Sequence, residues 1–478
     1  MNRPIVRLYG LVAVLFALLV AFTSRWTIFE ASSLRESPLN ERRVLKQERT
    51  PRGSIVAADG TVLARSVRDG EGVYRRTYPT GELFAAPIGY EDPELASTGL
   101  ERSRNQQLSG QAATNLQGVL DQLQGKEPQG EKVVTTLDPA AQRVAMSELG
   151  EHSGAVVAIE PRSGAVEVMV SKPSYDPNAY LHSRAYRERL SASGHSLDNR
   201  ATQFGYAPGS TFKIVTATAA IDTGRYTPDS TVDGRNELLV SGVPLKNDDN
   251  VSYGPVTLTY GLAHSINTVY AQVAEHVGKA TLGRYMERFG FDSKPQLDFP
   301  AQEMTASGEH EGEAIVPPGS PKVDLGRLGI GQDKLVVTPL QMAEVASAVA
   351  DHGTLMAPHL TRRVVDAEGT VRTVAPRVQS VVMKRSTAAA LTGMMEAVVK
   401  EGTGEAAQIP GIQVAGKTGT AQTQFGDAIN NVWFIAFAPA SDPRVALAVT
   451  LQAVPGEGAT FAAPVARAVI ESLLRTGT

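Results

Sequence analysis

The first long apolar stretch of the chain is residues 8–24, which carry no charged side chain. As a helix this stretch would be about 26 Å long, enough to cross the hydrocarbon core of a bilayer. Arg3 and Arg7 precede it, and basic residues on one flank of an anchor favour the cytoplasmic side. The pattern therefore predicts a cytoplasmic stub at residues 1–7, followed by a single transmembrane anchor.

A cleaved secretory signal is the alternative, because it also combines a basic start with an apolar run. The run ends in Ala21-Phe22-Thr23-Ser24, which offers no small-x-small cleavage site. Trp26 and Phe29 follow at the depth expected for the outer membrane interface. The sequence therefore favours an uncleaved, single-pass anchor in the cytoplasmic membrane, and under either interpretation the chain beyond residue 30 lies outside that membrane.

Residues 28–150 show little apolar periodicity. Residues 30–50 are polar and charged, as in a tether. Two short apolar runs then flank Asp59-Gly60, a strong hairpin signal. Brief helices are predicted around Tyr90–Leu100 and Ala113–Leu123. This region reads as a small domain without a large core of its own.

From residue 151 to the end the pattern predicts an α+β domain. A hairpin is expected at residues 154–170, around Pro161-Arg162-Ser163-Gly164. Helical patterns and then apolar strand patterns follow it. The helices are expected at 211–222, 256–289, 339–351, 385–400 and 462–474, and the strands at 414–422, 432–437 and 445–452. Strands at both ends of the segment imply one sheet that joins them.

Composition narrows the possible chemistry. The chain has 478 residues, too many for one compact core and suggestive of about three units. It has no cysteine, which excludes thiol catalysis, disulfides and thiolate metal sites. The histidines show no zinc-type spacing, so neither a metal nor a cofactor is expected. A net charge of −4 argues against nucleic acid as a partner.

Ser210 and Lys213 form the first candidate catalytic pair. Pro208-Gly209 interrupts local structure before a helical run, which places Ser210 in a first helical turn. Free backbone N–H groups and the helix dipole favour developing negative charge there. Positions i and i+3 share a helix face, so a desolvated Lys213 can act as the base for the Ser210 hydroxyl. A single Ser-x-x-Lys is weak alone, and an exposed pair is the alternative.

Ser265-Ile266-Asn267 is the second candidate motif. The Ser265 hydroxyl could relay a proton between a lysine and a leaving group, and the Asn267 amide could bind a peptide carbonyl. Most such tripeptides are loop or capping residues, so this motif gains value only from the others.

Lys417-Thr418-Gly419-Thr420 lies in a predicted strand. Thr418 and Thr420 project to one face of that strand, and Gly419 leaves room for another backbone to approach. An extended peptide could pair with such a strand at a sheet edge, with the Lys417 charge and the threonine hydroxyls holding a carboxylate. Taken alone, the tetrapeptide is equally compatible with an ordinary strand.

Together and in this order, the three motifs resemble those of penicillin-binding proteins and class A β-lactamases. Gly329-Ile330-Gly331-Gln332 and the segment 433–439 resemble the neighbouring segments of class B penicillin-binding proteins. Arg52-Gly53-Ser54-Ile55 and Gly99-Leu100-Glu101 resemble their N-terminal motifs. The resemblance spans about residues 50–475 and is greatest to the compact penicillin-binding protein A type of actinobacteria.

The resemblance implies a transmembrane helix, a small α+β pedestal at 28–150 and an α+β transpeptidase domain at 151–478. In that domain an antiparallel sheet would be flanked by helices, as in serine β-lactamases. The implied activity is a D,D-transpeptidase that cross-links peptidoglycan stem peptides through an acyl-enzyme and is acylated by β-lactam antibiotics. The implied site residues are Ser210, Lys213 and Ser265 for catalysis and Asn267, Lys417, Thr418, Gly419 and Thr420 for substrate binding, with the N–H groups of Ser210 and Thr420 as the oxyanion hole.

The pedestal is short for a class B protein and too small for a glycosyltransferase. A separate membrane peptidoglycan glycosyltransferase is therefore the expected partner. Glu101, in the Gly-Leu-Glu turn, is interpreted as structural rather than as an acid catalyst.

Two rival functions share these motifs. The first is a hydrolase, either a D,D-carboxypeptidase or a β-lactamase, although a membrane-tethered N-terminal region argues against the latter. The second is a non-catalytic β-lactam sensor or scaffold, although the short cytoplasmic stub leaves a sensor no output domain.

Overall fold

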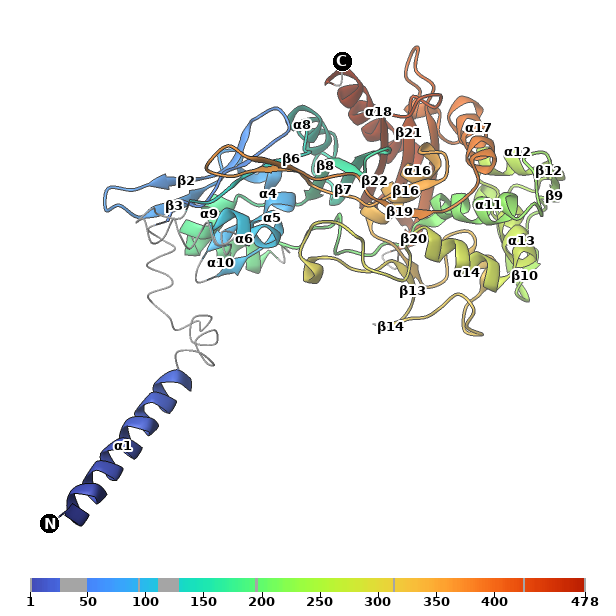
Figure 1. The fold of residues 1–478 in the computed structure, drawn as a ribbon. Coiled ribbons are helices and arrows are strands. Elements are labelled where there is room, and N and C mark those ends of the chain that lie inside the picture. Colours follow the sequence, from blue (N-terminus) through green and yellow to red (C-terminus); the bar gives the residue numbers. More distant parts are fainter. Residues whose placement is uncertain are drawn as a thin grey trace.

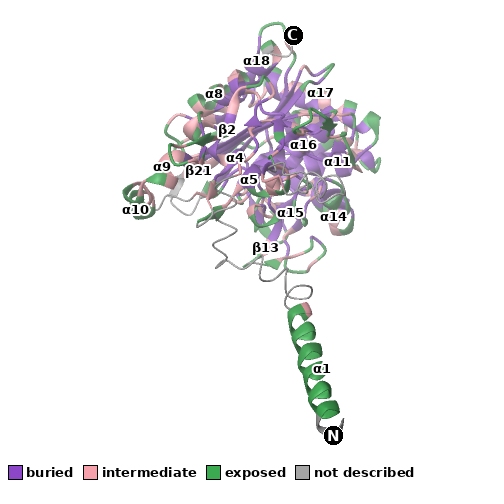
Figure 2. Ribbon diagram, turned by 60° about the vertical axis from the view of Figure 1, so that its left-hand side comes forward, coloured by how far each residue is buried: buried purple, intermediate pink, exposed green. Residues whose placement is uncertain are grey.

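The computed structural model describes residues 2–25, 50–92, 95–110, 129–193, 197–312, 314–423 and 426–476. The first element is helix α1 (Asn2–Ser24; Figure 1), which is exposed along nearly its whole length (Figure 2) and whose large apolar side chains from Ile5 to Phe22 are exposed. Among the described residues, its segment Ile5–Ser24 is the one stretch long and apolar enough to cross a membrane. Several predicted features lie outside the described residues: the interface residues Trp26 and Phe29, the helix at 113–123, and the tether at 30–50 except for its last residue.

A five-stranded antiparallel sheet forms the centre of the larger part of the chain. Its strand order is β20-β21-β22-β7-β8, which leaves β20 at one edge and β8 at the other. Two strands come from the hairpin predicted at residues 154–170, and three come from near the C-terminus. This confirms the prediction that one sheet joins both ends of the segment 151–478. The strands are β7 (Gly154–Glu160), β8 (Ala165–Lys172), β20 (Ala415–Thr423), β21 (Gly426–Ala438) and β22 (Val445–Val454).

Alternating side chains give this sheet two apolar faces. In β21, Val432 and Phe434 lie in one buried cluster with helices α8 (Pro139–Glu148) and α18 (Gly458–Thr476). Trp433 and its alternate neighbours lie in the other cluster, which includes α16 (Pro339–Ala350) and the remaining core helices. The sheet is thus covered on both sides (Figure 1), as the predicted fold class requires.

The helices on the second face flank the first two candidate motifs, while the third motif lies on strand β20. They are α11 (Lys213–Asp222), α12 (Leu258–Ala263), α13 (Asn267–Val277), α14 (Lys279–Arg288) and α17 (Arg385–Glu401), with the short 3-10 turn η3 (Gly209–Phe212) leading into α11. The helical pattern predicted for 256–289 is therefore divided into three helices. The breaks fall where Ser265 and Gly278 adopt positive φ values of 57° and 83°, a conformation that α-helices do not contain.

A second sheet contains the N-terminal strands, in the order β18-β17-β6-β1-β2-β3. The hairpin predicted around Asp59-Gly60 is present, because Ile55 of β1 pairs with Ala64 of β2. Strands β17 and β18 come from residues 361–373 and nevertheless complete this sheet, which local patterning gave no reason to expect. The strands are β1 (Ile55–Val56), β2 (Val62–Arg68), β3 (Tyr74–Thr77), β6 (Lys132–Thr135), β17 (Thr361–Val365) and β18 (Val371–Thr373).

The helix predicted around Tyr90–Leu100 is wrong. Short strands β4 (Glu91–Asp92) and β5 (Ala96–Ser97) pair there instead, and helices α5 (Gly99–Ser103) and α6 (Asn105–Leu108) follow. Positive φ values at Ala96 and Gly99 prevent one continuous helix across this segment.

Glu101 is fully buried and accepts hydrogen bonds from Arg52 Nε at 2.7 Å and Arg76 Nε at 2.5 Å. Burial raises the pKa of the Glu101 carboxyl, but the two arginine charges outweigh this effect and lower it. A carboxylate enclosed in this way joins the Arg52–Ile55 and Gly99–Glu101 motif segments, which agrees with the structural role inferred for it.

The other elements connect these layers. They are η2 (Gly81–Phe84), α4 (Ala85–Ile88), α9 (Pro177–His182), α10 (Arg184–Ala192), β9 (Thr231–Asp233), β10 (Leu238–Val240), β11 (Val243–Leu245), η4 (Asp248–Asn250), β12 (Pro255–Thr257), η5 (Ala301–Glu303), β13 (Gly308–Glu311), β14 (Ala314–Ile315), α15 (Leu325–Leu328), β15 (Leu335–Val336), β16 (Thr354–Met356), β19 (Val378–Val381) and η6 (Glu405–Ala407).

Candidate active site

Ser210 lies in the 3-10 turn η3, immediately before α11, and only 9% of its surface is exposed. Backbone atoms of two other segments pack closely against this turn. Gly209 N donates to Gly331 O at 3.0 Å, and a Cβ on Gly331 would lie 2.0 Å from Gly209 O. On the other side a Cβ on Gly209 would lie 2.5 Å from Thr420 O of β20. The serine is therefore held between the Gly329–Gln332 segment and the edge strand.

Lys213 is fully buried and points to the second motif. Its Nζ donates to the backbone oxygen of Ser265 at 2.6 Å and to Asn267 Oδ1 at 2.8 Å, and lies 3.3 Å from Ser265 Oγ. The hydrogen bonds found for Lys213 in the described part of the chain do not include one to the Ser210 hydroxyl. The lysine thus has its amine anchored by acceptors that come from the loop between α12 and α13.

Ser265 occupies this loop with a positive φ of 57°. Such a conformation is uncommon for a residue with a side chain and is found most often where function requires it. It lets the backbone oxygen of Ser265 face Lys213 while its hydroxyl accepts from Lys417 Nζ at 3.0 Å. The second motif therefore contacts both lysines.

Lys417, also fully buried, reaches this hydroxyl from β20. Its Nζ further donates to Thr418 O at 3.0 Å and lies 3.4 Å from Thr418 Oγ1. The Thr418 hydroxyl in turn lies 2.6 Å from the Thr403 hydroxyl, in the segment after α17. Lysine and threonine donors thus converge next to Ser265, an arrangement of donors that can bind an anionic group.

Gly419 and Thr420 complete the edge strand. A Cβ on Gly419 would lie 2.7 Å from Pro208 O and 2.9 Å from Thr211 Cγ2, so only glycine lets β20 approach the Ser210 turn this closely. The Thr420 hydroxyl accepts from Gly458 N at 3.4 Å, at the start of α18. The Thr420 side chain therefore faces α18, while its backbone lies against Gly209.

Burial governs the charge state of the two lysines. Desolvation lowers the pKa of Lys213 to about 7, although the charge of Asp248 opposes this effect. Desolvation and the nearby charge of Lys213 lower the pKa of Lys417 well below its ordinary value, again opposed by Asp248. Two ammonium groups that contact one serine hydroxyl repel each other, so keeping both of them charged costs free energy. The pair therefore holds an amine able to accept a proton near neutral pH.

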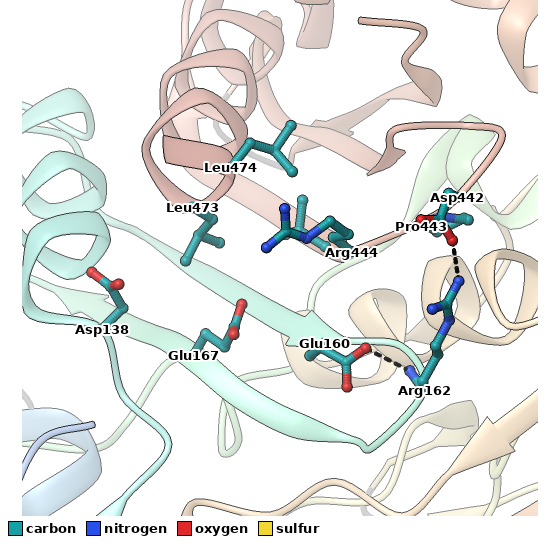
Figure 3. A pocket seen from close by; sticks show the side chains of 10 residues that line it. Asp138, Glu160, Arg162, Glu167, Asp442, Pro443, Arg444, Leu473 and Leu474 are labelled. Carbon is teal, nitrogen blue, oxygen red and sulfur yellow. Dashed lines mark hydrogen bonds and ion pairs between the residues drawn. The ribbon is translucent and has the colours of Figure 1, made fainter. Parts of the chain in front are cut away.

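A cavity of about 330 Å³ lies elsewhere, between β7, β8, β22 and the end of α18 (Figure 3). It is lined by acidic side chains and two arginines, and Arg162 pairs there with Asp442. Burial, together with the charges of Glu160 and Asp138, raises the pKa of Glu167 to about 7. Since β20 forms the opposite edge of the sheet, this cavity is separate from the Ser210 site.

Among the described residues no cluster of histidine or acidic side chains could hold a metal ion.

Asp248 and Thr403 touch the site, and the sequence patterns did not single them out. Asp248 Oδ1 accepts from Asn267 Nδ2 at 3.3 Å, and Thr403 contacts Thr418. Asp248 begins the short 3-10 turn η4 after a hairpin, and Thr403 lies in an irregular segment just after a helix. Neither position has a periodic or motif signal, so only the fold reveals them.

Comparison with protein families identifies the chain. Residues 154–471 match the family described as penicillin binding protein transpeptidase domain, and residues 52–133 match the penicillin binding protein A dimerisation domain. The chain belongs to the penicillin-binding protein transpeptidase family. The resemblance inferred from the motifs is thereby confirmed.

Relatives of this family match over the whole chain. The peptidoglycan D,D-transpeptidase PbpA of Mycolicibacterium smegmatis is 35% identical over 100% of both chains. PbpA of Mycobacterium tuberculosis is 33% identical over 99% of both. The ceftriaxone acyl-enzyme structure of penicillin-binding protein A from M. tuberculosis superposes with a TM-score of 0.81 at 32% identity, covering 90% of this chain and all of that one. Its imipenem acyl-enzyme counterpart gives a TM-score of 0.79.

Proposed function

We propose that this penicillin-binding protein is a peptidoglycan D,D-transpeptidase that cross-links stem peptides through an acyl-enzyme on Ser210 and is acylated there by β-lactams. The observation that carries the mechanism is the anchored amine of Lys213. Its N–H groups are directed at the backbone oxygen of Ser265 and at Asn267 Oδ1, which can only accept.

This arrangement orients the lysine as a base. When Lys213 is neutral its two N–H bonds serve those two oxygens, and the remaining tetrahedral position carries the lone pair. The lone pair is then left for a hydroxyl, either that of Ser210 one helical turn away or that of Ser265 at 3.3 Å. A pKa of about 7 makes the neutral form abundant at physiological pH.

In the acylation step, Ser210 gives its proton to Lys213 and its oxygen bonds to the carbonyl carbon of the penultimate D-Ala. The N–H groups of Ser210 and Thr420 receive the oxyanion, with each such donor worth about 3 kcal/mol. The C–N bond then breaks, and the leaving D-Ala amine takes up the proton from Lys213 through the Ser265 hydroxyl. Lys417, Thr418 and Asn267 hold the donor peptide, and its chain pairs with the open edge of β20, where Gly419 lies.

In the second step an acceptor amine attacks the acyl carbonyl. Its surplus proton passes to Lys213, the bond from the carbonyl carbon to Ser210 Oγ breaks, and Ser210 recovers its proton. The products are a new amide between two stem peptides and the free enzyme. β-Lactams enter the first step because their strained amide and carboxylate imitate D-Ala–D-Ala, and they persist because the second step fails.

We further propose that α1 anchors the protein in the cytoplasmic membrane with residues 1–7 inside and the catalytic domain outside. The exposed apolar surface of α1 supports the anchor, and the basic residues Arg3 and Arg7 at its start support this orientation. A separate membrane glycosyltransferase would supply nascent glycan strands, contacting the anchor at 8–24 and the pedestal at 28–150. Replacing the helix by an unrelated one and mutating the pedestal surface should leave penicillin acylation intact and reduce cross-linking in cells. Normal cross-linking after both changes would reject the partnership.

The activity itself is tested with polymerised lipid II and the purified full-length protein. Cross-linked dimers should form, and penicillin should abolish them. Release of D-Ala without dimers would instead identify a carboxypeptidase. The absence of both D-Ala release and dimers would identify a non-catalytic scaffold.

A further inference from the structure

Asp248 begins the short turn η4, which follows strand β11, and its side chain is exposed. Its Oδ1 accepts a hydrogen bond from Asn267 Nδ2 at 3.3 Å. The same nitrogen donates to the backbone oxygen of Lys246 at 3.2 Å. At its other end the Asn267 amide oxygen accepts from Lys213 Nζ at 2.8 Å. A continuous path therefore runs from a solvent-facing carboxylate through one amide to the buried lysine.

The direction of this path is fixed by the chemistry of its ends. A carboxylate and a backbone oxygen can only accept, so both require the NH₂ end of Asn267. The amide oxygen must then face Lys213. The opposite orientation would set an NH₂ group against a lysine amine and leave two acceptors without a donor.

The loop that carries Asp248 is itself held against α13. The neighbouring residue Asn247 is buried, and its Oδ1 accepts from both the backbone N and the hydroxyl of Thr268 at 3.0 Å. Its amide nitrogen donates to Gly234 O at 2.9 Å and Val251 O at 3.1 Å. Asp248 therefore has a defined position relative to Asn267.

The charged and titratable groups that face Lys213 come from three different elements. Lys213 faces Lys417 on β20, the ring of Tyr270 on α13 at 6.0 Å, and Asp248 on η4. The Tyr270 hydroxyl donates to Leu258 O at 3.1 Å, and burial raises its pKa well above the ordinary value, so it stays neutral. In the described part of the chain, Asp248 is the carboxylate whose charge raises the pKa of both lysines.

We infer that Asp248 is a positioning residue for the reaction: its carboxylate holds the Asn267 amide with the oxygen toward Lys213 and places a negative charge on the far side of that amide. This inference rests on the function proposed above. The side-chain hydrogen bond found for Asp248 among the described residues goes to Asn267 rather than to Ser210, so Asp248 acts through Asn267 and the local field.

The test measures the rate of penicillin acylation of the full-length protein between pH 5.5 and 9. Asp248→Asn keeps an oxygen for Asn267 Nδ2 and removes the charge. The acidic limb of its rate profile should move to lower pH by roughly half a unit, the size expected of one exposed charge, with a plateau within about threefold of the wild type. Raising the salt to 1 M should move the wild-type limb in the same direction, because salt screens an exposed charge, and should leave the variant unmoved.

Asp248→Ala removes both the charge and the acceptor, and its plateau rate should fall about tenfold. The matched control is Glu237→Gln, which neutralises another exposed carboxylate in the same region, 3.8 Å from Lys246 Nζ, and should reproduce the wild-type profile. Thermal unfolding of each variant verifies that the fold is retained.

An acidic limb unchanged in Asp248→Asn, or a plateau unchanged in Asp248→Ala, would overturn the inference while leaving Ser210 acylation intact. A shift of equal size in Glu237→Gln would overturn it as well, because the effect would then be a general one of surface charge. Failure of the proposed function looks different, since the wild type itself would then show no covalent penicillin adduct.

Discussion

Lys417 donates a hydrogen bond of 3.0 Å to the hydroxyl of Ser265, although the two residues lie 152 positions apart in the chain. Since Lys213 lies 3.3 Å from the same hydroxyl, one serine stands between two buried amines. A hydroxyl both donates and accepts, so this serine can pass a proton in either direction. The two buried lysines are therefore connected through a single hydroxyl.

Replacement of Lys213 by alanine should slow penicillin acylation by about 10²- to 10⁴-fold, the usual contribution of a positioned general base. In the wild type the rate should rise with pH through about 7, because the neutral amine is the active form and its pKa is about 7. Stopped-flow acylation across pH measures both effects. A wild-type rate that falls between pH 6 and 8 would contradict the assignment of Lys213 as base.

Replacement of Lys417 by alanine should have a different signature. Its Nζ lies beside Thr418 Oγ1, at the edge strand where we place the substrate carboxylate. The variant should bind carboxylate-bearing ligands more weakly, by at least the factor by which its acylation slows. Comparing the dissociation constant of the pre-covalent complex with the acylation rate separates the two effects. Equal loss of acylation in both lysine variants at unchanged affinity would show that the roles are misassigned.

Gly419→Ala should damage the site through packing alone. The added Cβ would meet Pro208 O at 2.7 Å and force β20 away from the nucleophile turn, at a cost of about 1–3 kcal/mol of stability. Gly393→Ala in α17 is the matched control, because a Cβ there meets nothing within 4 Å. It should leave acylation unchanged and stabilise the protein by about 0.5–1 kcal/mol. Equal acylation rates in the two variants would mean that the close approach of strand and turn is not required.

Much of the architecture could be predicted from local sequence patterns, because a short segment already shows the alternation of apolar and polar residues in a strand or the periodicity of a helix. The strand containing Trp433 and the helix beginning at Lys213 are examples. The association of β17 with the N-terminal strands, in contrast, depends on pairing Val364 with Val133 across the chain, and neither segment specifies its partner.

The site, too, could be predicted from the sequence only in part. The i, i+3 spacing places Lys213 one turn from Ser210, but the sequence does not reveal that its amine is held by Ser265 and Asn267. That contact depends on the positive φ of Ser265, and a serine gives no sign of such a backbone conformation. Asp248 and Thr403 could not be identified from the sequence for a related reason, since each lies in a short connecting segment without a periodic pattern.

Glu344 should make stability depend on pH. It is buried in α16 with one carboxyl oxygen unpaired, and burial raises its pKa to about 8. The folded state therefore keeps the proton while the unfolded chain loses it above about pH 4.5, so the stability contributed by this group falls as pH rises from about 4.5 to 8.

Glu344→Gln should flatten this dependence and raise stability at pH 8 by on the order of a few kcal/mol relative to the wild type. The exposed Glu401→Gln, at the end of α17, serves as the control and should leave the dependence in place. Thermal unfolding at pH 5 and pH 8 is the measurement. A Glu344→Gln variant whose melting temperature still falls as steeply as that of the wild type would contradict this account.

The central claim is that Ser210 is the nucleophile, and peptide mapping of the penicillin adduct tests it most directly. Full-length protein is treated with penicillin, digested and analysed by mass spectrometry, alongside a folded Ser210→Ala variant. The account predicts one covalent adduct on the peptide that contains Ser210 and none in the variant. An adduct on Ser265 or on any other residue, or undiminished labelling of Ser210→Ala, would contradict it.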